Sequence, residues 1–466
     1  MNYSTLFFIY YATFSACILI YAFSVYMLRF KLATASNFAF IFAFLIIALP
    51  GFYVADGTAQ EVINQKFNRG LDLQLYLIYL IFMPIVVAGL ISGHSVSKNI
   101  FVKTSVRRYF TLRFNILTIG ICSYCFLYLI WLPYIPFNNL FLSTSYGMVD
   151  IIKQRIAITH GLGYQENLPF LFRYWRNIAQ YILPVIFYYY LISKTKNSYK
   201  NRVLILIVLI FTVYLQVFTL EKAPLFMLMV GALFIYLLDK QYSTYSRNTV
   251  NIRLIIKCSF GLLITFSLLL IVYKYFMGSN SQLKDLMSRL GSQSASNYVQ
   301  IDFIRNHGFL GISGIKMPFV TRLLNLEFID PSKYAIATIY PAYVSGKVMG
   351  AAGGMSLTNL FFIMSWYSIP CFFVFVYLFA FFDRIVINSI YSNINKDAFY
   401  LNISFYAMFT VNFSIAVGSY IWIVFAIPTF FSPPIIIILF VYLFFIKIPG
   451  SFFKNNNKSP IISIQN

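Results

Sequence analysis

The chain has 466 residues, of which 60% are hydrophobic and only 10% are charged, and its mean hydropathy is +0.76. A soluble domain carries about 25% charged residues, so this composition excludes a water-soluble globular protein. The apolar runs reach about 20 residues, enough to cross about 30 Å of hydrocarbon, and they do not alternate as barrel strands do. The sequence therefore predicts an all-α, polytopic integral membrane protein with one membrane domain over residues 1–466.

The net charge of +22 would suggest a nucleic-acid partner in a soluble protein. In a membrane protein, excess Lys and Arg instead report orientation and contact with anionic lipids, so we expect membrane lipids and no nucleic acid as partners. The five cysteines all lie in apolar runs, which favours small buried side chains over a disulfide framework or a metal site. We expect no cofactor.

Eleven apolar spans are predicted in chain order. The first lacks a basic region before its apolar run, so we interpret it as a retained span and not as a cleaved signal peptide. The last contains Pro428, Pro433 and Pro434, which favour a break or a tilt. The spans lie at roughly 5–28, 35–55, 73–93, 114–133, 177–193, 203–220, 223–238, 254–276, 358–381, 398–417 and 424–446.

Basic residues in alternate connections predict the orientation. One set of short connections is rich in Lys and Arg and poor in acids, and it includes Asp383, Arg384 and Lys396 near the C-terminal end. The positive-inside rule places this set in the cytoplasm, so the N-terminus lies outside and the C-terminus inside. The other set contains two long connections, 134–176 and 277–357, which are too long to serve only as links and are expected to carry function.

The first long loop contains Arg155, His160, Arg173 and Arg176. Arg173 and Arg176 are three residues apart and share a helix face among aromatic residues. One interpretation is an anchor at the headgroup level of the membrane. The other is a phosphate-binding site, because the arginine side chain presents a planar fork to phosphate oxygens.

The second long loop contains Arg289 and the sequence IDFIRNHGF, which brings Asp302, Arg305 and His307 close together. A lone histidine is more often structural than catalytic, but His307, His160 and Asp302 are the candidates for a general base in these loops. The third histidine, His94, is expected in the cytoplasm with an incidental role.

The short turn LEKAPL places Glu221 and Lys222 at the outer mouth of the bundle. The two side chains are expected either to pair with each other or to leave Lys222 directed into a cavity under the long loops. The Gly-rich run 345–359 precedes the ninth span and does not fit a nucleotide-binding P-loop.

This layout resembles that of Wzy-type O-antigen polymerases, the repeat-unit polymerases of Gram-negative inner membranes. The resemblance rests on about eleven Phe-, Tyr- and Ile-rich spans, two long outer loops with arginines, the hairpin TLEKAPLF, and the run GAAGGMSLTNLFFIMSWYSIP. The Arg-x10-Gly pattern of some members is not kept, because Glu166 and Lys316 stand where glycine would be.

The resemblance implies a GT-C-like membrane glycosyltransferase that needs no metal. Its substrates would be glycans linked to undecaprenyl pyrophosphate, and its partners a chain-length regulator and a flippase. An acceptor hydroxyl would attack the anomeric carbon of the donor in the periplasm, and the lipid pyrophosphate would leave. The cations expected to hold that pyrophosphate are Arg155, Arg173, Arg176, Lys222, Arg289 and Arg305.

Three other functions stay open. An O-antigen ligase shares the class but transfers glycan to the lipid A core. A flippase or another transporter would be expected to keep ionisable residues near the membrane midplane, where the predicted spans have almost none. A structural or signalling membrane protein would not need so many outward-facing arginines.

Overall fold

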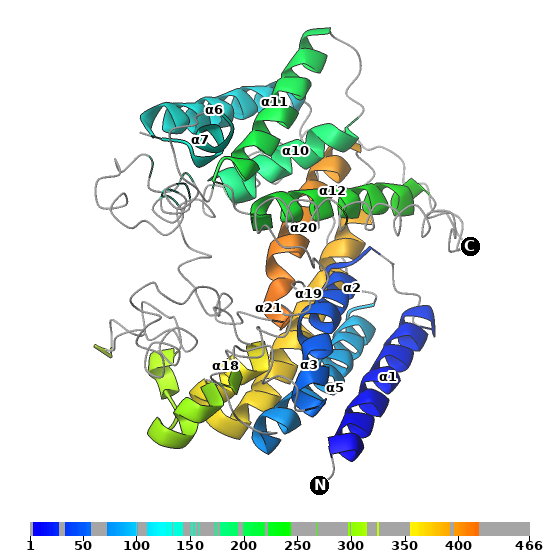
Figure 1. Cartoon of the computed structure of the whole chain (residues 1–466). Coiled ribbons are helices and arrows are strands. Elements are labelled where there is room, and N and C mark those ends of the chain that lie inside the picture. Colours follow the sequence, from blue (N-terminus) through cyan, green and yellow to red (C-terminus); the bar gives the residue numbers. More distant parts are fainter. Residues whose placement is uncertain are drawn as a thin grey trace, which may run out of the picture.

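In the residues that the computed structural model describes, the regular elements are helices, which confirms the all-helical class that the sequence predicts (Figure 1). The structure describes residues 3–27, 33–56, 72–98, 100, 110–132, 134–142, 151, 154, 158, 172, 175, 178–193, 199–219, 222–243, 267, 297–298, 300–314, 324–325, 355–391 and 396–418.

The helices form two groups, which occupy the lower and upper parts of Figure 1, and α2 and α19 contribute residues to the apolar cores of both. The lower group contains α1 (Tyr3–Met27), α2 (Ala35–Ala43), η1 (Phe44–Ala48), α3 (Leu49–Asp56), α5 (Leu73–Val96), η4 (Gly311–Gly314), α18 (Ser356–Met364), η5 (Ser365–Tyr367), α19 (Ser368–Tyr391) and α21 (Ile415–Gly418). The upper group contains α6 (Phe110–Trp131), α7 (Pro136–Leu142), η3 (Ile178–Ile182), α10 (Leu183–Ile192), α11 (Tyr199–Val217), α12 (Lys222–Ser243) and α20 (Lys396–Phe413).

Seven helices in the described residues are long and apolar enough to cross a membrane, and two shorter apolar helices cover Ile178–Ile192 and Arg202–Val217. The protein is thus a multi-pass membrane protein. Nine of the eleven predicted spans have a helical counterpart in these residues. The other two predicted spans, 254–276 and 424–446, lie outside the described residues apart from Ser267, so the count of eleven stays a prediction.

Two of the helices contain a proline that follows a wide helical turn. The π-helical turn η1 precedes Pro50, and η3 precedes Pro184. Proline has no N–H group and its ring clashes with the carbonyl four residues earlier. A π-turn, with bonds five residues apart, relieves that clash. The chain therefore continues as one rod from Ala35 to Asp56.

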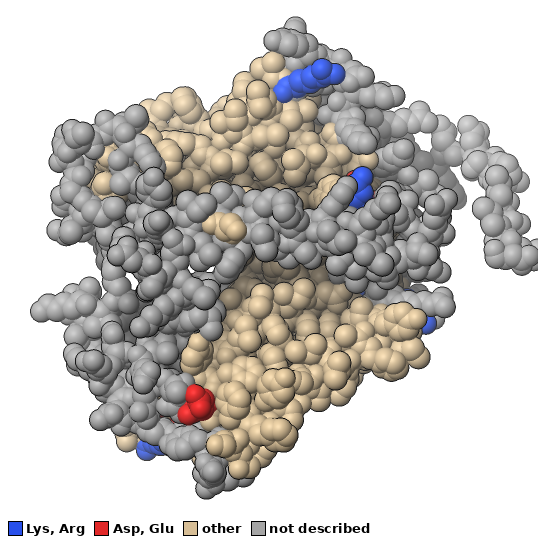
Figure 2. Space-filling view, turned by 45° about the vertical axis from the view of Figure 1, so that its right-hand side comes forward, with Lys and Arg blue, Asp and Glu red and all other residues tan. Residues whose placement is uncertain are grey.

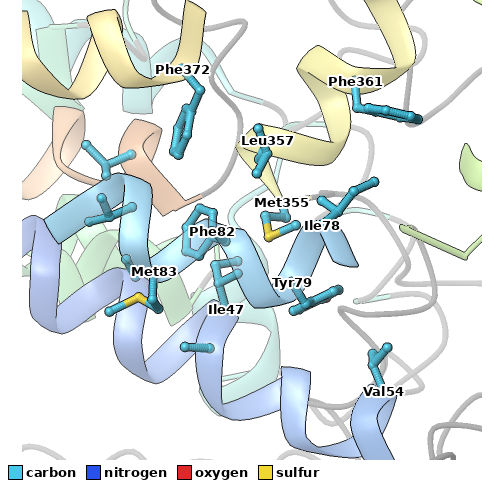
Figure 3. Close-up of a cluster of buried hydrophobic side chains, with 14 of the residues drawn as sticks. Ile47, Val54, Ile78, Tyr79, Phe82, Met83, Met355, Leu357, Phe361 and Phe372 are labelled. Atoms are coloured by element: carbon cyan, nitrogen blue, oxygen red, sulfur yellow. The ribbon is translucent and has the colours of Figure 1, made fainter. Parts of the chain in front are cut away.

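The core of the lower group is the contact between α5 and α19, which run parallel. The rings of Phe82 and Phe372 stack with centroids 5.6 Å apart (Figure 3). Further along, Gly89 and Gly93 of α5 leave no room for a side chain, since a Cβ on Gly93 would lie 2.3 Å from the carbonyl oxygen of Tyr377. Small residues four apart let two membrane helices approach closely, and this contact fixes the register of α19 on α5.

The predicted ninth span, 358–381, lies within a longer apolar helical stretch, Ser356–Tyr391, which has an interruption that the sequence did not predict. The helix breaks at Ser365, whose backbone φ is +58°, so that α18 and α19 are separate helices joined by η5. α19 continues to Tyr391 and includes Asp383 and Arg384, which the sequence assigned to a cytoplasmic connection. Residues 356–363 of α18 are all buried, whereas the break at η5 has no buried residue.

Large apolar side chains cover the outside of the helices. Leu19, Ile116, Ile130 and Ile210 are all more than half exposed. Figure 2 shows a face on which the described residues are almost all uncharged, with a few charged groups near its margins. Such a surface would be unusual in water, whereas in a bilayer it faces lipid tails.

Candidate functional site

Part of the second long loop packs among the helices of the lower group. The amide of Asn297 donates a hydrogen bond to the hydroxyl of Tyr79 on α5 (2.6 Å), and its oxygen accepts one from the N–H of Met355 (2.8 Å). The amide of Gln300 donates to Asn359 of α18 at 2.8 Å. These polar contacts are buried, which makes them strong and specific, so the loop has one defined position against α5 and α18.

The helical segment 300–307 presents two of the candidate residues at different depths. Asp302 is buried together with Ile301 and Phe303, whereas His307 is exposed at the end of the segment with its ring 4.6 Å from that of Phe303. A general base must reach the hydroxyl that it deprotonates. Of the two, His307 is the residue that a substrate arriving from the surface can reach.

Arg305 lies two residues before His307 and is paired with an acid. Its two terminal nitrogens lie 2.8 and 2.9 Å from the carboxylate oxygens of Asp72, the residue that precedes α5. This bidentate pair occupies the guanidinium of Arg305, the group expected from the sequence to bind a pyrophosphate. The pair also joins the connection before α5 to the second long loop, which the sequence assigns to the same side of the membrane.

The other candidate residues are not brought to this place by the described parts of the chain. Arg155, His160, Arg173, Arg176 and Arg289 lie outside the described residues. Lys222 is the first residue of α12, and its side chain is also outside the description.

The described neighbours of the first-loop arginines pack in the upper group. Phe172 is buried there, and Trp175 is 7% exposed and stacks on Tyr128 with ring centroids 4.2 Å apart. Neither ring is free to stack on a sugar. Figure 1 shows α7, from the start of this loop, well separated from α18.

A second polar cluster lies at the other end of α5 and α19. Asp383 is buried, and its Oδ2 accepts hydrogen bonds from the backbone N–H and the hydroxyl of Ser36 at 2.8 and 2.5 Å. Its Oδ1 accepts a short hydrogen bond from the hydroxyl of Tyr406, which in turn accepts one from the N–H of Ala35 at 2.7 Å. Nε2 of His94 lies 3.5 Å from Oδ2 of the same carboxylate.

The position of α2 gives a physical reason for this cluster. The first N–H groups of a helix have no partner within the helix, and the first turn of α2 is buried from Thr34 to Ser36. Asp383 on α19 and Tyr406 on α20 accept hydrogen bonds from two of these N–H groups. The hydroxyl of Thr34 accepts a third, from the N–H of Asn37, at 3.1 Å. The negative carboxylate also suits the positive end of the helix dipole. Asp383 therefore joins α2, α5, α19 and α20.

The sequence did not identify this cluster. His94 was assigned an incidental cytoplasmic role, but it is buried at the end of α5 beside Asp383. The available signal was the spacing of Gly89 and Gly93, directly before His94, because it indicates close packing of another helix at that level. Which helix would pack there was not readable from the sequence.

Among the described residues, no three side chains of the types His, Cys, Asp and Glu come together as a metal site would require. A comparison of the chain with family models, with curated proteins and with solved structures finds no match.

Proposed function

We propose that the protein is a membrane glycosyltransferase that joins oligosaccharide repeat units carried on undecaprenyl pyrophosphate into a surface polysaccharide. The proposal rests on the resemblance of its layout to Wzy-type O-antigen polymerases. The observation that supports it best is the seating of residues 297, 298 and 300–314 of the second long loop among α5 and α18, with His307 exposed at the end of a short helix. A rigid scaffold that presents an exposed acid–base residue suits a site built on loops.

In the proposed reaction, His307 accepts the proton of an acceptor hydroxyl, and that oxygen forms the new bond to the anomeric carbon of the donor. The bond from that carbon to the pyrophosphate breaks, and its electron pair stays with the departing pyrophosphate. Negative charge on the leaving group is stabilised by fixed cations. The candidates for this role are Arg155, Arg173, Arg176, Arg289 and Lys222, with the reaction at the periplasmic face of the inner membrane.

Deletion of the gene followed by glycan-ladder analysis tests the proposal. A single repeat unit on the lipid A core would support a polymerase, whereas a core without any glycan would favour a ligase or a flippase and contradict the proposal.

The role of His307 is tested by complementing the deletion with His307→Gln. We expect the variant to insert normally and to lower the rate of polymerisation by about 10²- to 10⁴-fold, the usual contribution of a general base. Asn306→Ala changes the exposed neighbour and should leave the ladder intact. A normal ladder from His307→Gln would remove this residue from the mechanism.

One observation favours a second candidate, a transporter. Asp383, Arg384 and His94 are buried within helices of membrane-spanning length, although the predicted spans had almost no ionisable groups. Ionisable residues within a membrane protein's spans often mark transport or proton pathways. Purified protein in liposomes distinguishes the two functions, because a transporter would move the lipid-linked glycan across the bilayer without lengthening it.

A further inference from the structure

The pair between Asp72 and Arg305 has an unequal environment. The carboxylate side chain is 8% exposed, and the arginine side chain is 48% exposed. Asp72 is held by two further contacts, because its Oδ1 accepts the N–H groups of Gln74 and Leu75 at 3.0 and 3.1 Å. It is the N-cap of α5, and both the capping bonds and the helix dipole favour its negative charge. Arg305 is thus bound to an acceptor that belongs to a fixed helix end.

The described residues around Arg305 have other attachments: Ile301, Phe303 and Ile304 pack in the apolar core, and hydrogen bonds hold the segment at its two ends. Before the segment, the side chain of Asn297 bonds to Tyr79, and at its start the side chain of Gln300 bonds to Asn359. After the segment, the N–H of Leu310 donates to the carbonyl of Phe362 at 3.1 Å. Arg305 adds a charged contact to the N-cap of α5 at the end that carries His307.

We infer that Arg305 is a positioning residue, which together with Asp72 sets the place of His307 against α5, and that it does not bind the donor's pyrophosphate. Two N–H groups of its guanidinium are directed at Asp72, and its charge is offset by the carboxylate. A pyrophosphate would have to compete with an acid fixed at the start of a helix. The part of this inference that concerns His307 as a base rests on the proposed function.

The variant Asp72→Asn separates the two roles, because asparagine keeps an oxygen that can cap α5 but loses the charge that holds Arg305. If Arg305 gripped the substrate, Asp72→Asn would free it and tighten donor binding. If Arg305 positions the segment, Asp72→Asn should behave like Arg305→Gln. Asp72→Glu keeps the charge and should retain most of the activity.

Steady-state kinetics of the purified full-length protein with a lipid-linked repeat unit give the first readout. We expect Asp72→Asn and Arg305→Gln each to lower kcat by about tenfold through misplacement of the base, with KM for the donor changed by less than about threefold. The double variant should be no worse than either single variant, because both remove the same contact. A donor KM that falls in Asp72→Asn and rises in Arg305→Gln would overturn the inference.

Hydrogen–deuterium exchange of the amides in 300–307 gives a readout that does not need activity. Loss of the pair should speed their exchange by about three- to tenfold in both variants, as expected for one partly exposed bidentate ion pair. Arg202→Gln, at an exposed arginine near the start of α11, is the matched control and should change nothing in this segment.

The two readouts separate the possible failures. Unchanged exchange in both variants would overturn the positioning role whatever the activity. If the wild-type protein lacks polymerase activity but exchange still rises in both variants, the proposed function fails while the docking of this segment by Asp72 and Arg305 stands.

Discussion

At the scale of single residues, Gly308 directly follows His307 and ends the helical segment that carries it. Its backbone φ is +80°, and its N–H donates to the carbonyl of Ile304 at 2.8 Å. This left-handed conformation directly after a helix is the usual way in which glycine ends it. The glycine therefore fixes where His307 stands at the end of the segment, and its role is structural.

Gly308→Ala should destabilise the protein by about 1–2 kcal/mol, because an L side chain strains the left-handed conformation. No neighbouring atom lies within 4 Å of the added Cβ, so the cost comes from the backbone alone. Thermal unfolding of the purified protein measures the change.

Gly120→Ala on α6 is the matched control for this variant. Its added Cβ also meets nothing within 4 Å, but it lies inside a helix. Alanine should stabilise that helix by up to about 1 kcal/mol, so equal effects of the two variants would contradict the role given to Gly308.

At the scale of helices, the parallel packing of α5 on α19 determines where the buried acid lies. Phe82, Gly89 and Gly93 meet Phe372, Val376 and Ala380 in order, and the next turn brings His94 to Asp383. Close approach at the glycines is therefore a condition for the polar cluster as well as for the apolar core.

Gly93→Ala should be destabilising by about 1–3 kcal/mol, because its Cβ would lie within 2.8 Å of both Ala380 and the backbone of Phe381. Backbone atoms cannot move aside without shifting α19. The expected sign in a thermal unfolding experiment is opposite to that of Gly120→Ala, and a neutral Gly93→Ala would show that the two helices are not packed this closely.

The interaction of Asp383 with the first turn of α2 makes a second prediction at this scale. Asp383→Asn leaves either the N–H of Ser36 or the hydroxyl of Tyr406 facing an amide donor, and loss of a buried acceptor costs about 1–3 kcal/mol. We expect a lower Tm and faster amide exchange in the first turn of α2.

Ser389→Ala serves as the control on the same helix, because the Ser389 hydroxyl donates to the carbonyl of Ile385 in the preceding turn of α19 at 2.6 Å. A transport role for Asp383 would give a different result. Asp383→Asn would then abolish transport with an unchanged Tm.

At the scale of the whole molecule, the Asp72–Arg305 pair constrains topology. It requires the connection before α5 and the second long loop to meet at one end of the helices. The positive-inside rule assigns both to the outside from charges alone, so two independent arguments agree that they share a side.

Reporter fusions should therefore give the same side after Gln60 and after Lys333, and we expect that side to be the periplasm. Fusions after Lys200 and after Arg247 should report the cytoplasm. Opposite sides for Gln60 and Lys333 would contradict the ion pair, and a cytoplasmic second loop would also exclude the proposed reaction at the periplasmic face.

The sequence by itself determined that this chain is an all-helical, multi-pass membrane protein and located nine of its helices to within a few residues for most ends. The reason is that each apolar run must be long enough to cross the hydrocarbon, a local property that needs no knowledge of neighbours. The sequence also placed Asp302, Arg305 and His307 in one short segment, because they are close along the chain.

Only the tertiary structure decided what those residues and others contact. Asp72 and Arg305 are paired although more than 200 positions separate them, and Asp383 caps a helix that begins over 300 positions earlier. Hydropathy cannot show that a helix continues through an aspartate, as α19 does, because the cost of burying the carboxylate is offset by donors on α2 and α20. Which residues contact one another depends on how whole helices pack. That packing is set by contacts such as those of Gly89 and Gly93 with α19.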